Sequence, residues 1–301
     1  MSFYPYPALS ATPPEKSLER LRVGERSALL YSPSAQPERL LFFFHGSQQS
    51  AQLARRFTGY AFEYLAQRTN SALIYPNGVH HHFNDGRRIL PEKTRSLGVD
   101  DCGFVLALSE IVGKRFPSLR ENIGMGYSNG GHMVMRVCHQ QPGFFSAAVL
   151  FAASMPAENN RIPEMRVDNY VPVPVLSFHG SRDPYAPFGG GAVGITPETA
   201  RGECLSALEN AQYFAQLNGS HGPIVETPTR APYLAQFDYQ APEQVADEVR
   251  IHRWEAAAPV ELIEVRGMGH VIPGTTDLPE RLGPGCVSVS AADEVQRFLG
   301  L

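Results

Sequence analysis

The chain has 301 residues, of which 43% are hydrophobic and 19% charged, a composition typical of a globular protein rather than a disordered or fibrous one. Its 26 Lys and Arg residues face 30 Asp and Glu residues, which gives a formal charge of -4, and no basic run forms a stripe along which nucleic acid could bind. No apolar stretch approaches the roughly 20 residues that a membrane-spanning helix needs. Neither nucleic acid nor a membrane span is therefore expected.

The first 25 residues are rich in proline and lack apolar periodicity, so they are predicted to form an arm over the surface. They contain no basic segment followed by an apolar one, and the chain as given is expected in the cytoplasm. The cysteines lie far apart without a CxxC pair, so free thiols are expected rather than a zinc or redox centre. These are Cys102, Cys138, Cys204 and Cys286.

From residue 26 to the end, short apolar runs alternate with helical patterns. This alternation predicts one α/β domain, residues 26–301, with a mostly parallel, doubly wound sheet covered by helices on both faces. The expected strands are 39–44, 71–75, 122–127, 146–152, 174–178 and 260–265. The expected helices are 51–67, one capped by Asp100 or Asp101, one from Asn129, 200–217 and 287–299. A proline-rich segment, 218–249, interrupts the alternation and is interpreted as an insertion beside the site.

The segment Gly126-Tyr-Ser128-Asn-Gly130 is the main functional signal. It follows an apolar strand and precedes a helix, which is the setting of a nucleophile elbow. Because strand and helix meet closely at such a turn, the residues two before and two after the serine must lack side chains. The sequence thus predicts Ser128 as a nucleophile, with the Asn129 N–H as one oxyanion donor.

A second oxyanion donor is expected in the loop after the strongest apolar run, within His45-Gly46-Ser47-Gln48-Gln49. We assign it to the N–H of Ser47. The alternative is a tight polar turn that binds nothing.

A serine needs a base and a carboxylate that orients the base, and behind an elbow of this kind they follow in the order acid, then histidine. Asp183 lies just after the strand that ends at Phe178, and His270 just after the strand that ends at Val265. Asp183 could instead merely begin a turn with Pro184. His221 and His252 are weaker candidates for the base because neither follows a strand end.

Two clusters of basic residues could serve other functions, a metal site or contact with an anion. The consecutive histidines His80, His81 and His82 diverge in a loop, so they are not expected to share a metal ion. Arg87 and Arg88 are expected in solvent, with contact to an anionic substrate as the alternative. No cofactor and no metal are predicted.

The chain resembles the α/β-hydrolase family of polyhydroxybutyrate depolymerases and feruloyl-esterase-like carbohydrate esterases. The likeness extends from about Leu40 to Gly274. It rests on the segments 45–49, 75–78, 83–86 and 99–104, the elbow, His179-Gly180 and Gly269-His270. The resemblance implies a triad of Ser128, Asp183 and His270, and a substrate contacted by Gln49, Phe83 and Tyr127.

The chain also departs from this family. Arg88 and Ser220 stand where many secreted relatives have cysteines, so the family disulfides are not expected. Phe83 stands where relatives often have tryptophan, and Val271-Ile272-Pro273-Gly274 replaces their Trp-Pro-Gly. These positions shape the cleft, so the family's substrates do not carry over directly.

Together these features predict a serine carboxylic ester hydrolase that acts on a small-molecule or oligomeric ester. A serine peptidase or amidase with the same triad, and a catalytically inactive hydrolase fold that serves as a binding module, are the alternatives. The acyl and alcohol groups, the oligomeric state, and whether segment 218–249 covers the site are left open by the sequence.

Overall fold

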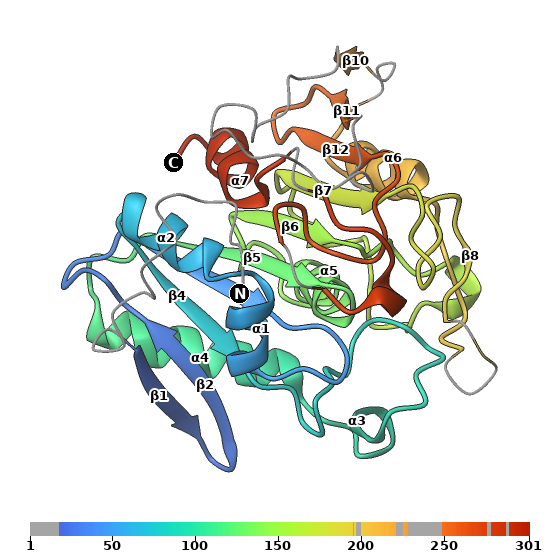
Figure 1. Cartoon of the computed structure of the whole chain (residues 1–301). Helices are drawn as coiled ribbons and strands as arrows, with labels where there is room; N and C mark the ends of the chain where they lie inside the picture. Colours follow the sequence, from blue (N-terminus) through green and yellow to red (C-terminus); the bar gives the residue numbers. More distant parts are fainter. Residues whose placement is uncertain are drawn as a thin grey trace.

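A ten-stranded sheet forms the centre of the molecule, with helices on both faces (Figure 1). The computed structural model describes residues 18–194, 196, 200–220, 225–227, 249–275, 278–286 and 289–301. The strand order is β1-β2-β4-β3-β5-β6-β7-β12-β11-β10. The central strands from β4 to β12 are parallel, whereas both ends of the sheet are antiparallel. The predicted doubly wound, mostly parallel sheet is confirmed.

The strands of this sheet are β1 Leu18–Val23, β2 Arg26–Tyr31, β3 Arg39–Phe44, β4 Ser71–Pro76, β5 Glu121–Tyr127, β6 Ala147–Phe151, β7 Val175–Gly180, β10 Val225–Thr227, β11 Val249–Trp254 and β12 Val260–Val265. A separate pair comprises β8 Gly191–Ala192 and β9 Glu203–Cys204. The helices are α1 Ala51–Phe57, α2 Ala61–Arg68, α3 Lys93–Ser96, α4 Asp101–Arg115, α5 Asn129–Gln140, α6 Ala207–Leu217 and α7 Ala291–Leu299. Two short 3-10 helices, η3 Glu158–Asn160 and η6 Glu280–Leu282, complete the described elements.

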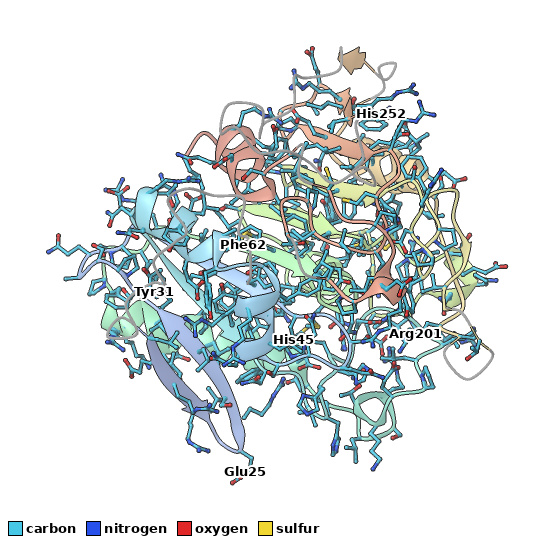
Figure 2. All side chains as sticks on the ribbon, viewed as in Figure 1. Glu25, Tyr31, His45, Phe62, Arg201 and His252 are labelled. Carbon is cyan, nitrogen blue, oxygen red and sulfur yellow. The ribbon has the colours of Figure 1, made fainter. Side chains whose placement is uncertain are left out.

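The apolar run of β3 is continuous because both faces of this strand are buried. Alternate side chains point to opposite faces of a strand. Phe42 and Phe44 pack in the cluster that includes α4, α5 and α6. Leu41 and Phe43 pack in the opposite cluster, with α1, α2 and α7. Phe62 of α2 lies 4.9 Å from Phe43, ring centre to ring centre, and is labelled in Figure 2.

Three predicted helices begin or end elsewhere than expected. The helix predicted over 51–67 is two helices, because Gly59 and Tyr60 both adopt left-handed backbone angles that end α1. The helix predicted from residue 200 begins at Ala207, where Ser206 and Glu209 form a capping box. The last helix begins at Ala291 rather than at 287, because the Ser290 side chain caps it.

Part of the predicted N-terminal arm is a strand. Residues 18–23 form β1, which pairs with β2 in a hairpin whose tip carries Glu25 (Figure 2). Residues 1–17 of the arm lie outside the described residues. So does most of the predicted insertion 218–249, apart from its first residues, the backbone of β10 and the start of β11.

The four cysteines are free, as predicted, and all four are buried. Burial raises the pKa of Cys102 to about 11 and the pKa of both Cys138 and Cys204 to about 12. No helix within the described part of the chain combines the length and the apolar character of a membrane span.

Candidate active site

Ser128 occupies a sharp turn between β5 and α5. Its backbone has φ 51° and ψ -115°, a conformation that costs a residue with a side chain of order 1 to 3 kcal/mol. A Cβ atom on Gly130 would lie 2.0 Å from the carbonyl oxygen of Phe44, and one on Gly126 would lie 2.3 Å from the backbone of Gly130. The steric reason given for both glycines is therefore observed.

A chain of hydrogen bonds joins the three residues predicted as nucleophile, base and acid. The Ser128 hydroxyl donates to Nε2 of His270 across 2.9 Å. Nδ1–H of His270 donates to Oδ2 of Asp183 across 2.7 Å. This pairing fixes the imidazole tautomer, so that Nε2 is free to accept the serine proton.

The sheet topology explains why residues so far apart in sequence meet. Ser128 follows β5, Asp183 follows β7 and His270 follows β12, and these strands lie in the consecutive parallel set β5-β6-β7-β12 (Figure 1). The carboxyl ends of parallel strands open onto the same edge of a sheet, which is where ligands bind in such folds. The predicted convergence at one sheet edge is thus observed.

Asp183 is held in its charged form. Its Oδ1 accepts hydrogen bonds of 2.8 Å from the N–H groups of Tyr185 and Ala186. Burial would raise the pKa of Asp183, but the charge and hydrogen bond of His270, with the Ala186 N–H, more than offset that effect, and the pKa lies below its ordinary value. The neighbouring His179 donates to the carbonyl of Ala186, and burial lowers its pKa, so it is neutral.

Tyr127, predicted to contact substrate, lines the pocket and also fixes the base. Its hydroxyl donates to the carbonyl oxygen of His270 across 2.6 Å, and its ring lies 5.3 Å from the imidazole. Phe57 packs on the same ring at 4.9 Å. Burial raises the pKa of Tyr127, so its hydroxyl remains a donor.

The loop that carries Ser47 is anchored by His45. Nδ1–H of His45 donates to the Gly46 carbonyl, and its Nε2 accepts from the N–H of Gly78. Burial lowers the pKa of His45 to about 4, which keeps the imidazole in the neutral form that can make both bonds. Gln49 lines the pocket as predicted, although its Oε1 is already engaged by the N–H of Gly46 at 3.0 Å.

The N–H groups of Ser47 and Asn129, predicted as oxyanion donors, have no acceptor among the described residues. Ser47 lines the pocket, and Asn129 is the first residue of α5, where a helix leaves its N–H groups unpaired. Neither N–H donates a hydrogen bond to any residue that the structure describes. Both are thus available to a ligand oxygen.

Phe83, predicted to contact substrate, does not reach the pocket. Its ring is 1% exposed and packs against Phe44 and His45. Its N–H and C=O are both bonded to the side chain of Asn129, at 2.8 and 3.0 Å. The ring is turned inward, so Phe83 supports the elbow from behind and the prediction of substrate contact is corrected.

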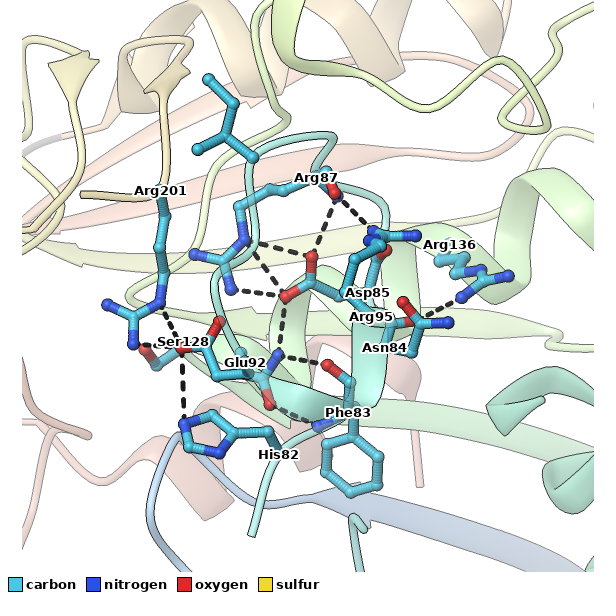
Figure 3. Close-up of polar contacts among 12 residues, drawn as sticks. His82, Phe83, Asn84, Asp85, Arg87, Glu92, Arg95, Ser128, Arg136 and Arg201 are labelled. Carbon is cyan, nitrogen blue, oxygen red and sulfur yellow. Dashed lines mark hydrogen bonds and ion pairs between the residues drawn. The ribbon is translucent and has the colours of Figure 1, made fainter. Parts of the chain in front are cut away.

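Behind the elbow lies a buried ion pair that the sequence analysis missed (Figure 3). Arg87 donates to both carboxylate oxygens of Asp85, and the side chain of Asn129 donates to Oδ2 of Asp85 across 2.6 Å. Arg87 is only 2% exposed, so the prediction that it lies in solvent is wrong, whereas Arg88 is exposed as expected. The fully buried guanidinium lowers the pKa of Asp85 to about 2 despite the opposing effect of burial.

His81 and His82, two of the three consecutive histidines, have separate partners. Nδ1 of His81 contacts the carbonyl of Gln49, while Nδ1 of His82 contacts that of His80. Nε2 of His82 lies 3.5 Å from Oε1 of Glu92. Among the described residues, no group of three or more His, Cys, Asp and Glu side chains is arranged to hold a metal ion.

Comparison with known proteins identifies the architecture. No protein-family model matches the chain. NocK of Nocardia uniformis subsp. tsuyamanensis, a protein provisionally named an esterase, is 27% identical over 280 residues, which cover 89% of this chain and 75% of NocK. The structure of an acetyl xylan esterase from Aspergillus awamori superposes with a TM-score of 0.59 at 13% sequence identity. The match covers 94% of this chain and 99% of the esterase chain. TT1662 from Thermus thermophilus matches 94% of this chain and 96% of its own with a TM-score of 0.51 at 18% identity.

The chain has the α/β-hydrolase fold. In this chain Ser128, Asp183 and His270 follow one another in the order expected of the fold. Ser128 and His270 open onto a pocket of about 580 Å³, a volume within the range of small-molecule sites. Its walls include Ser47, Phe57, Tyr127 and Tyr185.

Proposed function

We propose that this α/β-hydrolase is a serine carboxylic ester hydrolase, with Ser128 as nucleophile, His270 as base and Asp183 as the acid that orients the base. The observation that carries this proposal is the hydrogen-bonded chain from Ser128 through His270 to Asp183, which begins at the surface of the pocket. The similarity to NocK, named as an esterase, supports the choice of ester over other acyl substrates.

In the proposed reaction, the Ser128 hydroxyl attacks the ester carbonyl while Nε2 of His270 takes its proton. His270 then returns that proton to the departing alcohol, which leaves an acyl group on Ser128. A water molecule, activated by the same nitrogen, attacks the acyl carbonyl and releases the acid. Asp183 stabilises the imidazolium formed in both steps, which its lowered pKa permits.

Negative charge develops on the carbonyl oxygen during both attacks. We assign its stabilisation to the N–H groups of Ser47 and Asn129, which lack an acceptor among the described residues. Loss of one such donor typically costs about 3 to 4 kcal/mol of barrier. The anchoring of Ser47 through His45, and of Asn129 through Phe83 and Asp85, keeps both donors in place before substrate arrives.

We further propose that the enzyme belongs with the polyhydroxybutyrate depolymerase and feruloyl-esterase-like hydrolases that the sequence resembles. Tyr127 and Gln49 remain candidates for substrate contact because both line the pocket. Phe83 no longer belongs to that set.

The test compares wild type with Ser128→Ala on 4-nitrophenyl acetate, with Ser96→Ala as a matched control on the exposed side of α3. Ser128→Ala is expected to lower kcat by about a millionfold, and a fluorophosphonate probe should label wild type and Ser96→Ala only. Hydrolysis by Ser128→Ala at the wild-type rate would refute the assignment. So would a folded wild type that neither hydrolyses esters nor reacts with the probe.

A further inference from the structure

Arginine side chains line the pocket beside Ser128. Four of its described lining residues are arginines, and none is Asp or Glu. This composition contrasts with the whole chain, which carries a formal charge of -4. The positive residues come from distant parts of the sequence and are Arg56, Arg87, Arg201 and Arg281.

Two of these arginines are compensated by carboxylates behind the pocket wall. Arg87 is paired with Asp85, and Arg201 donates through its Nε to Glu92 across 2.8 Å (Figure 3). Such paired cations contribute little net charge to the cavity, because their partners lie next to them. Arg87 and Arg201 therefore form part of the pocket wall, and Arg56 and Arg281 remain as the arginines that can give the pocket a net positive charge.

The remaining two, Arg56 and Arg281, have no such partner among the residues that the structure describes. Both are exposed, and neither forms an ion pair with any residue within the described ranges. Arg56 lies in the last turn of α1, and Arg281 lies in η6. Arg56 and Arg281 both line the pocket that Tyr127 and Ser128 also line. Both arginines therefore belong to the same cavity as the nucleophile.

Unpaired guanidinium groups at the mouth of a pocket attract anions and bind carboxylates through two parallel hydrogen bonds. We infer that the ester cleaved at Ser128 carries a carboxylate, which Arg56 and Arg281 bind at the pocket mouth while the scissile carbonyl lies at Ser128. This inference rests on the proposed ester hydrolase function and narrows its substrate class. Because both arginines are exposed, the carboxylate belongs on the part of the substrate that extends from the reacting carbonyl toward solvent.

The experiment measures kcat/KM for matched pairs of esters. On the acyl side, 4-nitrophenyl hydrogen glutarate is compared with its neutral methyl ester. On the alcohol side, 4-carboxyphenyl acetate is compared with 4-carbamoylphenyl acetate. Wild type is expected to prefer the anionic member of one pair by about tenfold, and raising the salt from about 50 mM to about 500 mM should shrink that preference. The pair that responds shows which half of the ester carries the carboxylate.

Three variants separate charge from structure. The double variant R56Q/R281Q should lose most of the preference, whereas R56K/R281K, which keeps both charges, should retain part of it. Arg22→Gln removes one exposed positive charge on β1, away from the pocket lining, and should behave as wild type. Hydrolysis of neutral esters by wild type without any anionic preference would overturn this inference alone. Preference retained in R56Q/R281Q would overturn it as well, and failure of wild type to hydrolyse any ester would overturn the proposed function together with it.

Discussion

The buried pair of Asp85 and Arg87 offers a quantitative test of how the elbow is supported. In Asp85→Asn the side chain keeps its size but loses its charge, and Arg87 is left as a buried cation whose side chain is 3% exposed. Removal of one partner from a buried ion pair typically costs about 3 to 5 kcal/mol. The lowering of the Asp85 pKa from 3.8 to about 2 corresponds to about 2 kcal/mol of net stabilisation of the charged carboxylate, with the opposing effect of burial included. We therefore expect Asp85→Asn to reduce the free energy of unfolding by about 2 to 5 kcal/mol.

Urea unfolding followed by the fluorescence of the single tryptophan, Trp254, measures this change. Arg87→Met provides the matched partner for a double-mutant cycle, because it removes the cation and leaves a chain of similar length. Each single variant should have a lower free energy of unfolding than wild type. The loss in the double variant should be about 2 kcal/mol smaller than the sum of the two single losses. If Asp85→Asn unfolds at the wild-type urea concentration, or if the two effects simply add, the pair does not support the elbow.

The same pair predicts a direction for the pH dependence of stability. Because the folded pKa of Asp85 is lower than its unfolded value, its contribution is fully present above the unfolded pKa and is lost as the pH falls from about 3.8 toward about 2. Asp85→Asn should lack this part of the acid loss. In that variant Asn129 also loses its charged acceptor, so kcat per folded molecule should fall while wild type and Arg22→Gln remain alike.

The remaining predictions concern the base, the elbow and the thiols. Asp183→Asn should lower kcat on 4-nitrophenyl acetate by about ten thousandfold with little change in KM, because His270 loses the acceptor that sets its tautomer; a loss below about tenfold in steady-state kinetics would argue against that role. Gly130→Ala should yield little folded protein by circular dichroism, because its Cβ would overlap the carbonyl of Phe44, whereas Gly113→Ala, where a Cβ meets nothing within 4 Å, should fold normally. A thiol-specific reagent should react with all four cysteines in urea but only slowly in native protein, and rapid native reaction would contradict their burial.

The parts of the fold that the sequence predicts best are those buried on both faces. The run 39–44 and the strand before Ser128 are continuous apolar segments, so their type and approximate ends follow from composition alone. The antiparallel strands β1 and β2 were not predicted. β1 pairs on one side only and is partly exposed, so the sequence carries neither a continuous apolar run nor a clean alternation there.

The candidate site divides in the same way. Ser128, Asp183 and His270 each follow a strand end, and the order of the strands brings them together, so local patterns were sufficient to find them. The orientation of Phe83 and the burial of Arg87 depend on contacts with distant segments, through Asn129 and Asp85. A single sequence holds no periodic signal for such contacts. The segment 83–86 enters the sequence analysis only through the family resemblance, and Arg87 only as a basic residue expected in solvent.

At the strained turn of Ser128, the residue that would favour stability differs from the residue that the proposed reaction needs. Glycine alone adopts a φ of 51° without penalty, so Gly at position 128 would relax the backbone and abolish the nucleophile in a single change. Selection of a variant library for thermal stability alone would thus favour variants that have lost the nucleophile and with it the activity. Any effort to make this protein more robust must therefore screen for turnover at every round.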